Sequence, residues 1–245
     1  AAGGYHSLFL TESGQIFIAG TTVLSVCADE SLRLVRMPKH VLVVQVACGT
    51  YHCLALTDDG SLLSWGRDSD TGRLGHGRHF DFYEREQATI WDGNHQVTRP
   101  RRVTALDGVH VQEVSAGEDH SLCISAEGGL YSWGDPSFGR LGLPLEMPGT
   151  DMSFEDRIAA EMEWERWCSV PRRVCETVQF THASAGLQHS LAVSAQGHLY
   201  AWGAAKSGQL GNGIDATHDD DDGDDDDEGA APVRLPTRVE GLSGV

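Results

Sequence analysis

Short apolar runs separated by tight-turn residues recur along this chain. One example is the pair of runs at residues 52–57 and 61–65, which flank Asp58-Asp59-Gly60. Glycine supplies the positive φ that a tight turn requires, so the pattern predicts a β-hairpin. Further strands are expected upstream of such hairpins, at residues 41–47, 109–116 and 177–185. These runs are apolar on both faces more often than alternating, which favours sheets packed between neighbouring sheets.

The hairpin belongs to a repeat that occurs in four copies. Each copy has a Gly-x-x-His phrase, a turn glycine and an aromatic-Gly or Ala-Gly phrase, and three copies add Gly-Arg/Gln-Leu-Gly. The repeated histidines are His6, His52, His120 and His189, the turn glycines include Gly60, Gly128 and Gly197, and the tryptophans are Trp65, Trp133 and Trp202. Pro-x-x-Val phrases at 38–41, 100–103 and 171–174 precede the upstream strands. A repeat of short strands with this kind of period predicts a radial β-propeller.

The Ala-Gly-x-x-His-Ser-Leu, Trp-Gly and Gly-Gln/Arg-Leu-Gly phrases resemble those of the regulator of chromosome condensation repeat family. The resemblance implies an all-β fold, a β-propeller of the seven-bladed type. This chain would supply four blades, at residues 1–40, 41–103, 104–174 and 175–245. An arc of four blades leaves apolar faces uncovered at both ends, so we expect about three further blades from residues outside this sequence or from a partner.

Three insertions interrupt the repeat at the same point of the blade and are therefore expected on one face. They lie at residues 76–99, 143–170 and 212–235. The first is rich in aromatic residues and is expected to form a small hairpin or a docking patch. The third carries nine acidic residues, at 219–222 and 224–228, and their mutual repulsion predicts a disordered loop. The candidate partner contacts in the first two insertions are Phe80, Phe82, Tyr83, Trp91, Trp164 and Trp167.

The second insertion is expected to contain a helix. Ser153 is a candidate N-cap with Asp156 three residues later, and no glycine or proline interrupts residues 154–169. Its apolar residues do not form one stripe. The helix is therefore expected either to pack on the propeller rim or to contact a partner.

The repeated histidines, tryptophans and glycines have mainly structural interpretations. A catalytic residue has no reason to occur four times, so each histidine is expected to bond its ring N–H to the backbone. The tryptophans should be buried with their indole N–H satisfied, and the glycines should permit close backbone approach. No nucleophile elbow, phosphate loop or zinc signature is present, so no cofactor, metal or catalytic site is expected.

Composition narrows the choice of partners. The formal net charge is −18, which argues against binding to nucleic acid, and no apolar run is long enough to span a bilayer. Six cysteines occur without a Cys-x-x-Cys pair, which predicts reduced core thiols and an intracellular location, cytoplasmic or nuclear. A metal site formed by Cys48, His52 and Cys53 is disfavoured, because strand alternation points neighbouring side chains to opposite faces.

Two functions remain open at this point. A protein-interaction scaffold, either a domain of a larger protein or a subunit of an assembly, needs only the features above. The alternative, implied by the family resemblance, is guanine-nucleotide exchange on a small GTPase, with the insertion at 76–99 as the element that displaces the nucleotide. Small-molecule catalysis in a propeller channel has no supporting residue cluster.

Overall fold

The computed structural model of the chain describes residues 1–20, 32–68, 72–77, 88–91, 94–144, 153–212 and 231–240. The described strands form four antiparallel sheets that follow one another in chain order. The first sheet contains β1 (His6–Leu10), β2 (Ile16–Gly20) and β3 (Arg33–Leu34), and the second contains β4 (Val43–Cys48), β5 (His52–Thr57), β6 (Leu62–Asp68), β8 (Asn94–Arg102) and β7 (Ala88–Trp91). The third contains β9 (Val111–Ala116), β10 (His120–Ser125), β11 (Leu130–Gly134) and β12 (Arg172–Arg173), and the fourth contains β13 (Phe180–Ala185), β14 (His189–Ser194), β15 (Leu199–Gly203) and β16 (Val233–Arg238).

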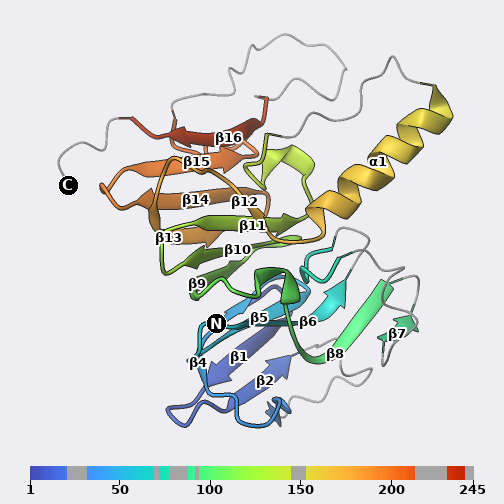
Figure 1. Cartoon of the computed structure of the whole chain (residues 1–245), viewed down its shortest axis with the longest axis vertical. Helices are drawn as coiled ribbons and strands as arrows, with labels where there is room; N and C mark the ends of the chain where they lie inside the picture. Colours follow the sequence, from blue (N-terminus) through green and yellow to red (C-terminus); the bar gives the residue numbers. More distant parts are fainter. Residues whose placement is uncertain are drawn as a thin grey trace.

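The sheets are stacked side by side as consecutive blades, from β1 at the bottom to β16 at the top of Figure 1. The first strands of successive complete blades contact one another, since β4 touches β9 and β9 touches β13. This stacking confirms the all-β propeller architecture expected from the repeat. Each sheet is one copy of the repeat, so its side chains occupy equivalent places in successive blades.

The hairpin at the centre of each blade keeps one register. His52, His120 and His189 pair with Gly66, Gly134 and Gly203. At the tip of the second blade, Gly60 has φ +78° and donates its N–H to the Thr57 carbonyl at 3.0 Å. A side chain would strain that backbone conformation, which explains why glycine ends the turn in every copy.

The core consists of layers between blades rather than one central mass. One cluster joins the first two sheets through Leu8, Ile16 and Trp65, and a second joins the middle sheets through Leu54 and Trp133. A third lies between the last two sheets and includes Leu122, Phe180 and Trp202. The central strands β5 and β10 therefore bury both of their faces, in agreement with the apolar character of both faces in the sequence.

The fourth strand of the second, third and fourth blades was not expected from the sequence. In the third blade it is β12, only two residues long, which pairs with β11 through Arg172 and Arg173. The Pro-x-x-Val phrase therefore supplies the outermost strand instead of leading into the next blade. So short a run carries no period by which it could be recognised.

The expected place of this phrase in the first blade is wrong. Residues 38–41 were aligned with the later Pro-x-x-Val phrases, but β3 takes that position in the structure. The Val35 N–H bonds the Ile16 carbonyl, as the Val103 N–H bonds the Leu62 carbonyl. The first copy lacks the proline that marks this strand in the others, and Leu32 stands in its place.

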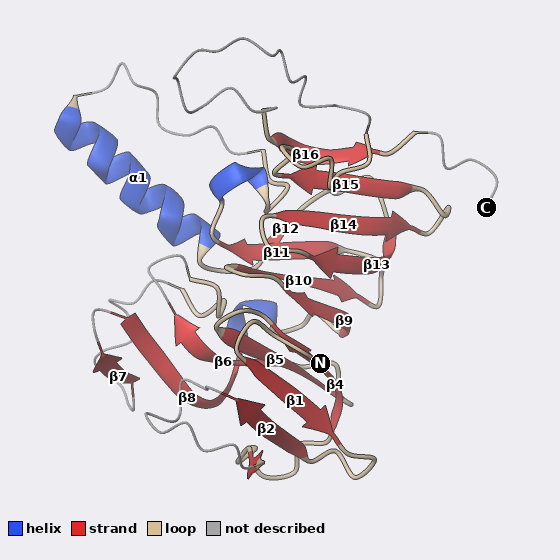
Figure 2. Cartoon of the chain, turned by 180° about the vertical axis from the view of Figure 1, so that it is seen from behind, coloured by secondary structure: helices blue, strands red, loops and turns tan. Residues whose placement is uncertain are grey.

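The insertions contain the two elements that lie outside the regular blades. The first forms the β7–β8 hairpin, in which Trp91 pairs with Asn94, and the second contains helix α1 (Phe154–Cys168). Figures 1 and 2 show both elements on the same side of the stacked sheets, as expected. β8 begins at Asn94 and β16 at Val233, so both strands start inside the expected insertion bounds. Residues 213–230, with the acidic run, lie outside the described residues.

Candidate functional site

The repeated residues meet at a hydrogen-bonded junction between blades. In the second and third blades, His52 Nε2 lies 2.8 Å from Ser121 Oγ, and this hydroxyl donates to the Arg73 carbonyl at 2.9 Å. The Trp133 indole N–H donates to the same carbonyl at 3.0 Å. Because the serine proton is given to the carbonyl, His52 must donate from Nε2. One backbone oxygen thus accepts hydrogen bonds from two signature residues of the third blade, and the serine links it to His52 of the second.

The next pair of blades repeats the junction. His120 Nε2 lies 2.8 Å from Ser190 Oγ, and both the Ser190 hydroxyl and the Trp202 indole donate to the Arg140 carbonyl, at 2.8 and 2.9 Å. The expectation that the histidine ring bonds the backbone is therefore wrong for these copies, since the partner is a side chain of the following blade. A one-sequence reading cannot find this partner, because it lies about seventy residues away.

Burial keeps these imidazoles neutral. It lowers the pKa of His52 well below the usual value and that of His120 to about 3, with nearby Arg73 and Arg140 adding to the effect. Both side chains are fully buried. A neutral ring that donates from Nε2 is a fixed structural bridge, not a general base at a reaction centre.

Glycine makes room for the histidine ring. A Cβ added to Gly117 would lie 2.5 Å from His120 Cε1, and one added to Gly186 would lie 2.3 Å from His189 Cε1. No real Cβ tolerates such contacts. The Gly-x-x-His phrase is therefore one steric unit, in which the glycine is needed because the ring folds back over it.

The first junction differs from the later ones. His6 Nε2 lies 3.0 Å from Cys53 Sγ, which stands where the next two blades have Ser121 and Ser190. The Trp65 indole N–H is buried and has no hydrogen-bond partner among the residues that the structure describes. The hydrogen bond that we expected for this indole N–H is therefore absent among the described residues.

The surface next to these junctions is the candidate functional site. We call it the insertion face: the loops at 4–5, 49–51, 117–119 and 186–188, the turns at 72–75, 139–142 and 208–211, and helix α1. The second strand of each blade begins at this face and the third strand ends there, because the two are antiparallel partners. The insertions follow the third strand, so they emerge here as well.

Two arginines of the Gly-Arg-Leu-Gly turns brace the loops of this face. Arg73 Nη1 lies 2.6 Å from Asp119 Oδ1 of the following blade, and its Cζ lies 5.1 Å from the ring centroid of Tyr51. Tyr5 packs beside Tyr51 with 5.7 Å between ring centroids and is 60% exposed. The buried guanidinium thus carries a layer of tyrosine that reaches solvent.

The second arginine supports an apolar part of the face. Arg140 Nη2 lies 3.3 Å from Asp135, its Nη1 donates to the Leu187 carbonyl at 3.5 Å, and its Cζ lies 5.5 Å from the Phe138 ring. Leu187 is 60% and Phe138 42% exposed. Neither these arginines nor the exposed residues beside them were predicted, although the Gly-Arg-Leu-Gly phrase is plain in the sequence.

Helix α1 uses its C-terminal end to pack on the propeller. Trp164 and Trp167 are half-buried against the cluster between the third and fourth blades, and Cys168 is fully buried. Arg172 stacks over the Trp167 ring at 4.6 Å and donates to the Trp167 carbonyl at 3.0 Å. The helix was expected either to pack on the propeller rim or to contact a partner. In the structure both tryptophans pack on the rim.

The remaining candidate contacts cannot be placed in the same way. Phe80, Phe82 and Tyr83 lie outside the described residues, and for Trp91 the structure describes the backbone within β7 but not the side chain. Their role as partner contacts stays a prediction.

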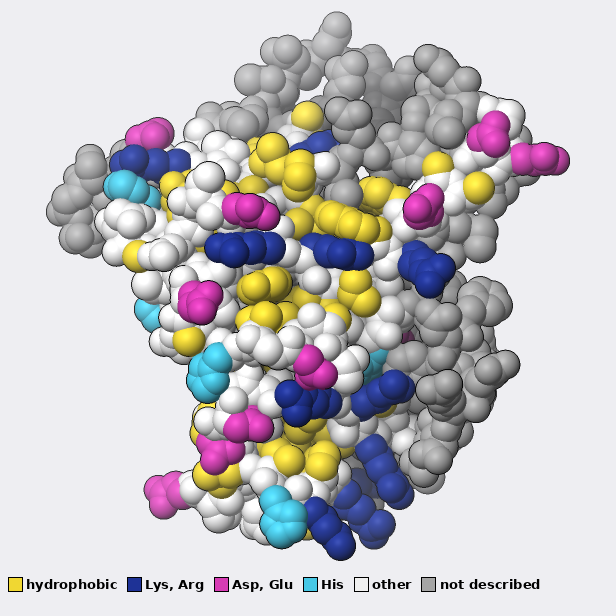
Figure 3. Space-filling view, viewed as in Figure 1, with side chains coloured by type: hydrophobic (Ala, Val, Ile, Leu, Met, Phe, Trp, Pro, Cys, Tyr) yellow, Lys and Arg dark blue, Asp and Glu magenta, His cyan; other side chains and the backbone are white. Residues whose placement is uncertain are grey.

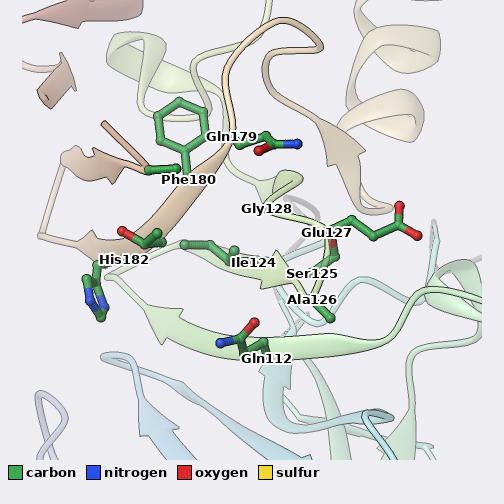
Figure 4. A pocket seen from close by; sticks show the side chains of 11 residues that line it. Gln112, Ile124, Ser125, Ala126, Glu127, Gly128, Gln179, Phe180 and His182 are labelled. Atoms are coloured by element: carbon green, nitrogen blue, oxygen red, sulfur yellow. The ribbon is translucent and has the colours of Figure 1, made fainter. Parts of the chain in front are cut away.

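The opposite face carries a cleft of about 450 Å³ between the third and fourth blades. Figure 4 shows Gln112 on β9, Glu127 at the tip after β10, and Gln179 and His182 at the start of β13 around it. His182 also pairs with Glu113 at 2.9 Å. The cleft is lined by both polar and apolar residues, and its Ser125 hydroxyl accepts from the Gly129 N–H while His182 pairs with Glu113, so the two are not joined as a nucleophile and a base.

Among the described residues, no group of three or more His, Cys, Asp or Glu side chains is arranged to hold a metal ion. Nor is any helix in the described ranges long and apolar enough to cross a membrane. Five described cysteines are free thiols, and Cys27 lies outside the described residues.

Positive charge is concentrated on the outermost strands despite the acidic composition. Figure 3 shows Lys and Arg side chains gathered in rows across the middle of one face, with hydrophobic side chains between them. Arg101 and Arg102 on β8, Arg173 on β12 and Arg238 on β16 are all exposed. Two of these arginines have acidic neighbours, since Arg102 lies 2.9 Å from Asp107 and Arg238 lies 3.8 Å from Glu240.

Comparison with known proteins shows which family of repeats this sequence matches. Two profiles, both described as "Regulator of chromosome condensation (RCC1) repeat", match the chain, one at residues 43–71, 111–140 and 180–209 and the other at residues 59–124, 127–193 and 196–245. "Probable E3 ubiquitin-protein ligase HERC3" of Homo sapiens is 32% identical over 188 residues, which cover 77% of this chain and 15% of that protein. "Guanine nucleotide exchange factor SRM1" of Saccharomyces cerevisiae is 31% identical over 221 residues, which cover 87% of this chain and 42% of that protein.

The fold agrees with the sequence comparison. The structure titled "Crystal structure of Kap60 bound to yeast RCC1 (Prp20)" matches 99% of this chain and 48% of that chain, with a TM-score of 0.70 and 26% identity. This chain thus spans less than half the length of these relatives. The repeats matched by the second profile cover more than half of the sequence, and the chain belongs to the regulator of chromosome condensation (RCC1) repeat family.

Proposed function

We propose that this chain is a protein-interaction scaffold that docks partners on its insertion face. The observation that carries the proposal is the exposure of Tyr5, Phe138 and Leu187 on this face. Arg140 contacts the Phe138 ring and the Leu187 carbonyl, and Tyr5 packs beside Tyr51, on which Arg73 stacks. Large aromatic and aliphatic side chains that are held rigid lose little conformational entropy on binding and are typical anchors of protein interfaces.

Phe138 adds a conformational argument. Its φ is +60°, a left-handed conformation that costs a residue with a Cβ about 1–2 kcal/mol. The strain orients an aromatic ring toward solvent at the turn that precedes Gly139. Glycine could adopt the same backbone without strain. Phenylalanine at this position therefore lowers stability, which favours a role in binding.

The test separates binding from folding. The chain with Phe138→Gly should be as stable as the parent or more stable, because the strain is relieved, yet it should lose partners captured from a cell extract. Leu187→Ser should lose the same partners. Leu235→Ser is the matched control, since Leu235 is 48% exposed on β16, an outermost strand. Capture that is unchanged by Phe138→Gly and Leu187→Ser would contradict docking on this face.

A second candidate function is guanine-nucleotide exchange on a small GTPase. It is supported by the similarity to SRM1 over 87% of this chain and by the β7–β8 hairpin in the first insertion. Nucleotide release should be measured on a panel of small GTPases, with residues 78–93 replaced by a short Gly-Ser linker as the comparison. Fast nucleotide release that is lost in the linker variant would establish exchange activity. No accelerated nucleotide release from any GTPase of the panel would contradict exchange and leave the scaffold function as the proposal.

We also propose an intracellular location. The support is the set of five free thiols, four of them buried, without any disulfide among the described residues. Imaging of the tagged full-length protein in its own cells tests this, and a secreted or surface signal would contradict it.

A further inference from the structure

Blade two departs from the other repeats at two positions that face each other. Cys48 stands where the other copies have Ala2, Ala116 and Ala185, and Cys53 stands where they have Ser7, Ser121 and Ser190. Cys48 on β4 and Cys53 on β5 are direct partners in the antiparallel register. Because the two cysteines are paired across β4 and β5, we consider them as one site.

The geometry of the pair permits a disulfide. Directly opposed residues of antiparallel strands have Cα atoms about 4.5 or 5.5 Å apart, and both spacings lie within the range that disulfides occupy. Cys48 Sγ lies 3.6 Å from the Ala1 carbonyl oxygen, and the His6 ring lies 3.0 Å from Cys53 Sγ. The register therefore places the two cysteines at a spacing that a disulfide can bridge.

The environment makes the two thiols unequal. A hydrogen bond from the Cys53 thiol, opposed by burial and assisted by His6, lowers the pKa of Cys48 to about 5, whereas burial raises the pKa of Cys53 well above its usual value. Cys48 retains 8% exposure and Cys53 only 2%. The lowered pKa and the greater exposure both favour Cys48 as the nucleophile, because the thiolate is the reactive form of cysteine.

We propose that Cys48 and Cys53 form a reversible disulfide when the protein meets a peroxide, with Cys48 as the attacking residue and Cys53 as the resolving residue. Cys48 sulfur attacks one oxygen of hydrogen peroxide, so an S–O bond forms, the O–O bond breaks, and hydroxide leaves and is protonated to water. Cys53 sulfur then attacks the sulfenic sulfur, an S–S bond replaces the S–O bond, and its proton leaves with the hydroxyl as a second water. Two thiols are oxidised and one peroxide is reduced.

The disulfide would also change a contact between blades. The Cys53 thiol is the side-chain partner of His6, in the place that serine hydroxyls fill at the two later junctions. The disulfide would bond Cys53 Sγ to Cys48 Sγ and so change the group that the His6 ring meets. Oxidation would therefore alter the first junction and leave the others unchanged.

The test uses the full chain, reduced and then exposed to an equimolar amount of hydrogen peroxide. Remaining thiols are blocked with N-ethylmaleimide in denaturant, and the labelled cysteines are mapped by mass spectrometry after digestion. We expect labelling of Cys48 and Cys53 to be lost together and to return completely after dithiothreitol. Persistent labelling of both residues, or oxidation of Cys175 in their place, would overturn the proposal.

Substitutions that copy the residues of the other repeats are expected to leave the fold intact. Cys48→Ala and Cys53→Ser introduce the residues found at these positions in the other three copies, and each should abolish the protected pair. In Cys53→Ser the reaction should stop at a Cys48 sulfenic acid, which dimedone traps. Cys175→Ser removes a half-buried cysteine elsewhere and should leave the disulfide unchanged. A disulfide-linked Cys48 peptide that still forms in Cys53→Ser would refute the assigned pairing.

Discussion

At the residue scale, one carbonyl oxygen explains most of the repeat signature. The Arg73 carbonyl receives the Ser121 hydroxyl and the Trp133 indole, and the serine in turn receives His52. All of these groups are buried, where an unpaired donor or acceptor costs about 1–3 kcal/mol. The serine therefore links the histidine to the carbonyl, and its loss leaves the histidine Nε2–H without an acceptor.

This dependence predicts the effect of Ser121→Ala. The variant leaves the His52 Nε2–H without an acceptor and should lower the free energy of unfolding by about 1–3 kcal/mol in urea titrations. Ser7→Ala, the equivalent change in the first repeat, is the matched control because Ser7 is only half-buried and is expected to cost less than about 0.5 kcal/mol. Equal losses in the two variants would show that the junction contributes nothing.

The buried imidazoles also predict an acid sensitivity. In the unfolded chain a histidine takes up its proton near pH 6.5, whereas folded His120 stays neutral down to about pH 3. Between these values the unfolded state binds more protons, so stability falls as the pH falls, by up to about 1.4 kcal/mol per pH unit for each such histidine. His120→Gln should reduce this slope by about that amount between pH 6 and pH 4. An unchanged slope in urea midpoints measured across this range would disprove the assignment.

At the element scale, some strands could be predicted from the sequence and others could not. The β5–β6 and β14–β15 hairpins could be predicted because glycine turns and apolar runs are local signals. β12 could not, since two residues show no periodicity, and its pairing with β11 spans the whole second insertion. The exposed anchors Phe138 and Leu187 were missed for a similar reason, because exposure depends on how blades stack and not on the local pattern.

Helix α1 combines a predictable start with an unpredicted docking end. The Asp156 N–H donates to Ser153 Oγ at 3.2 Å, which is the expected N-cap, while Trp164 and Trp167 pack on the rim. Ser153→Ala should therefore fray the first turn, by about 1 kcal/mol, and leave global unfolding unchanged. Trp167→Ala should lower global stability by about 2 kcal/mol or more. Amide exchange of the helix and urea unfolding separate the two, and a global loss in Ser153→Ala would contradict this division.

At the scale of the whole molecule, stability comes from contacts between neighbouring repeats. Each described core cluster but the last joins two sheets, and that last cluster, around Ala201, Leu210 and Val239, lies on the fourth sheet alone. A groove of about 280 Å³ opens over this cluster and is lined by Leu191 and Leu199. Repeat proteins of this kind gain stability from each interface, so equivalent residues need not contribute equally.

A series of equivalent leucines measures this inequality. Leu54 and Leu122 are fully buried against the following sheet, whereas Leu191, at the same position in the fourth repeat, is only half-buried. Leu54→Ala and Leu122→Ala should each lower the free energy of unfolding by about 2–5 kcal/mol, because each removes packed atoms and leaves a cavity. Leu191→Ala should cost about 1 kcal/mol, since solvent reaches that side chain already. Urea titrations of the three variants provide the comparison, and an equal cost at Leu191 would mean that another surface covers the fourth sheet in solution.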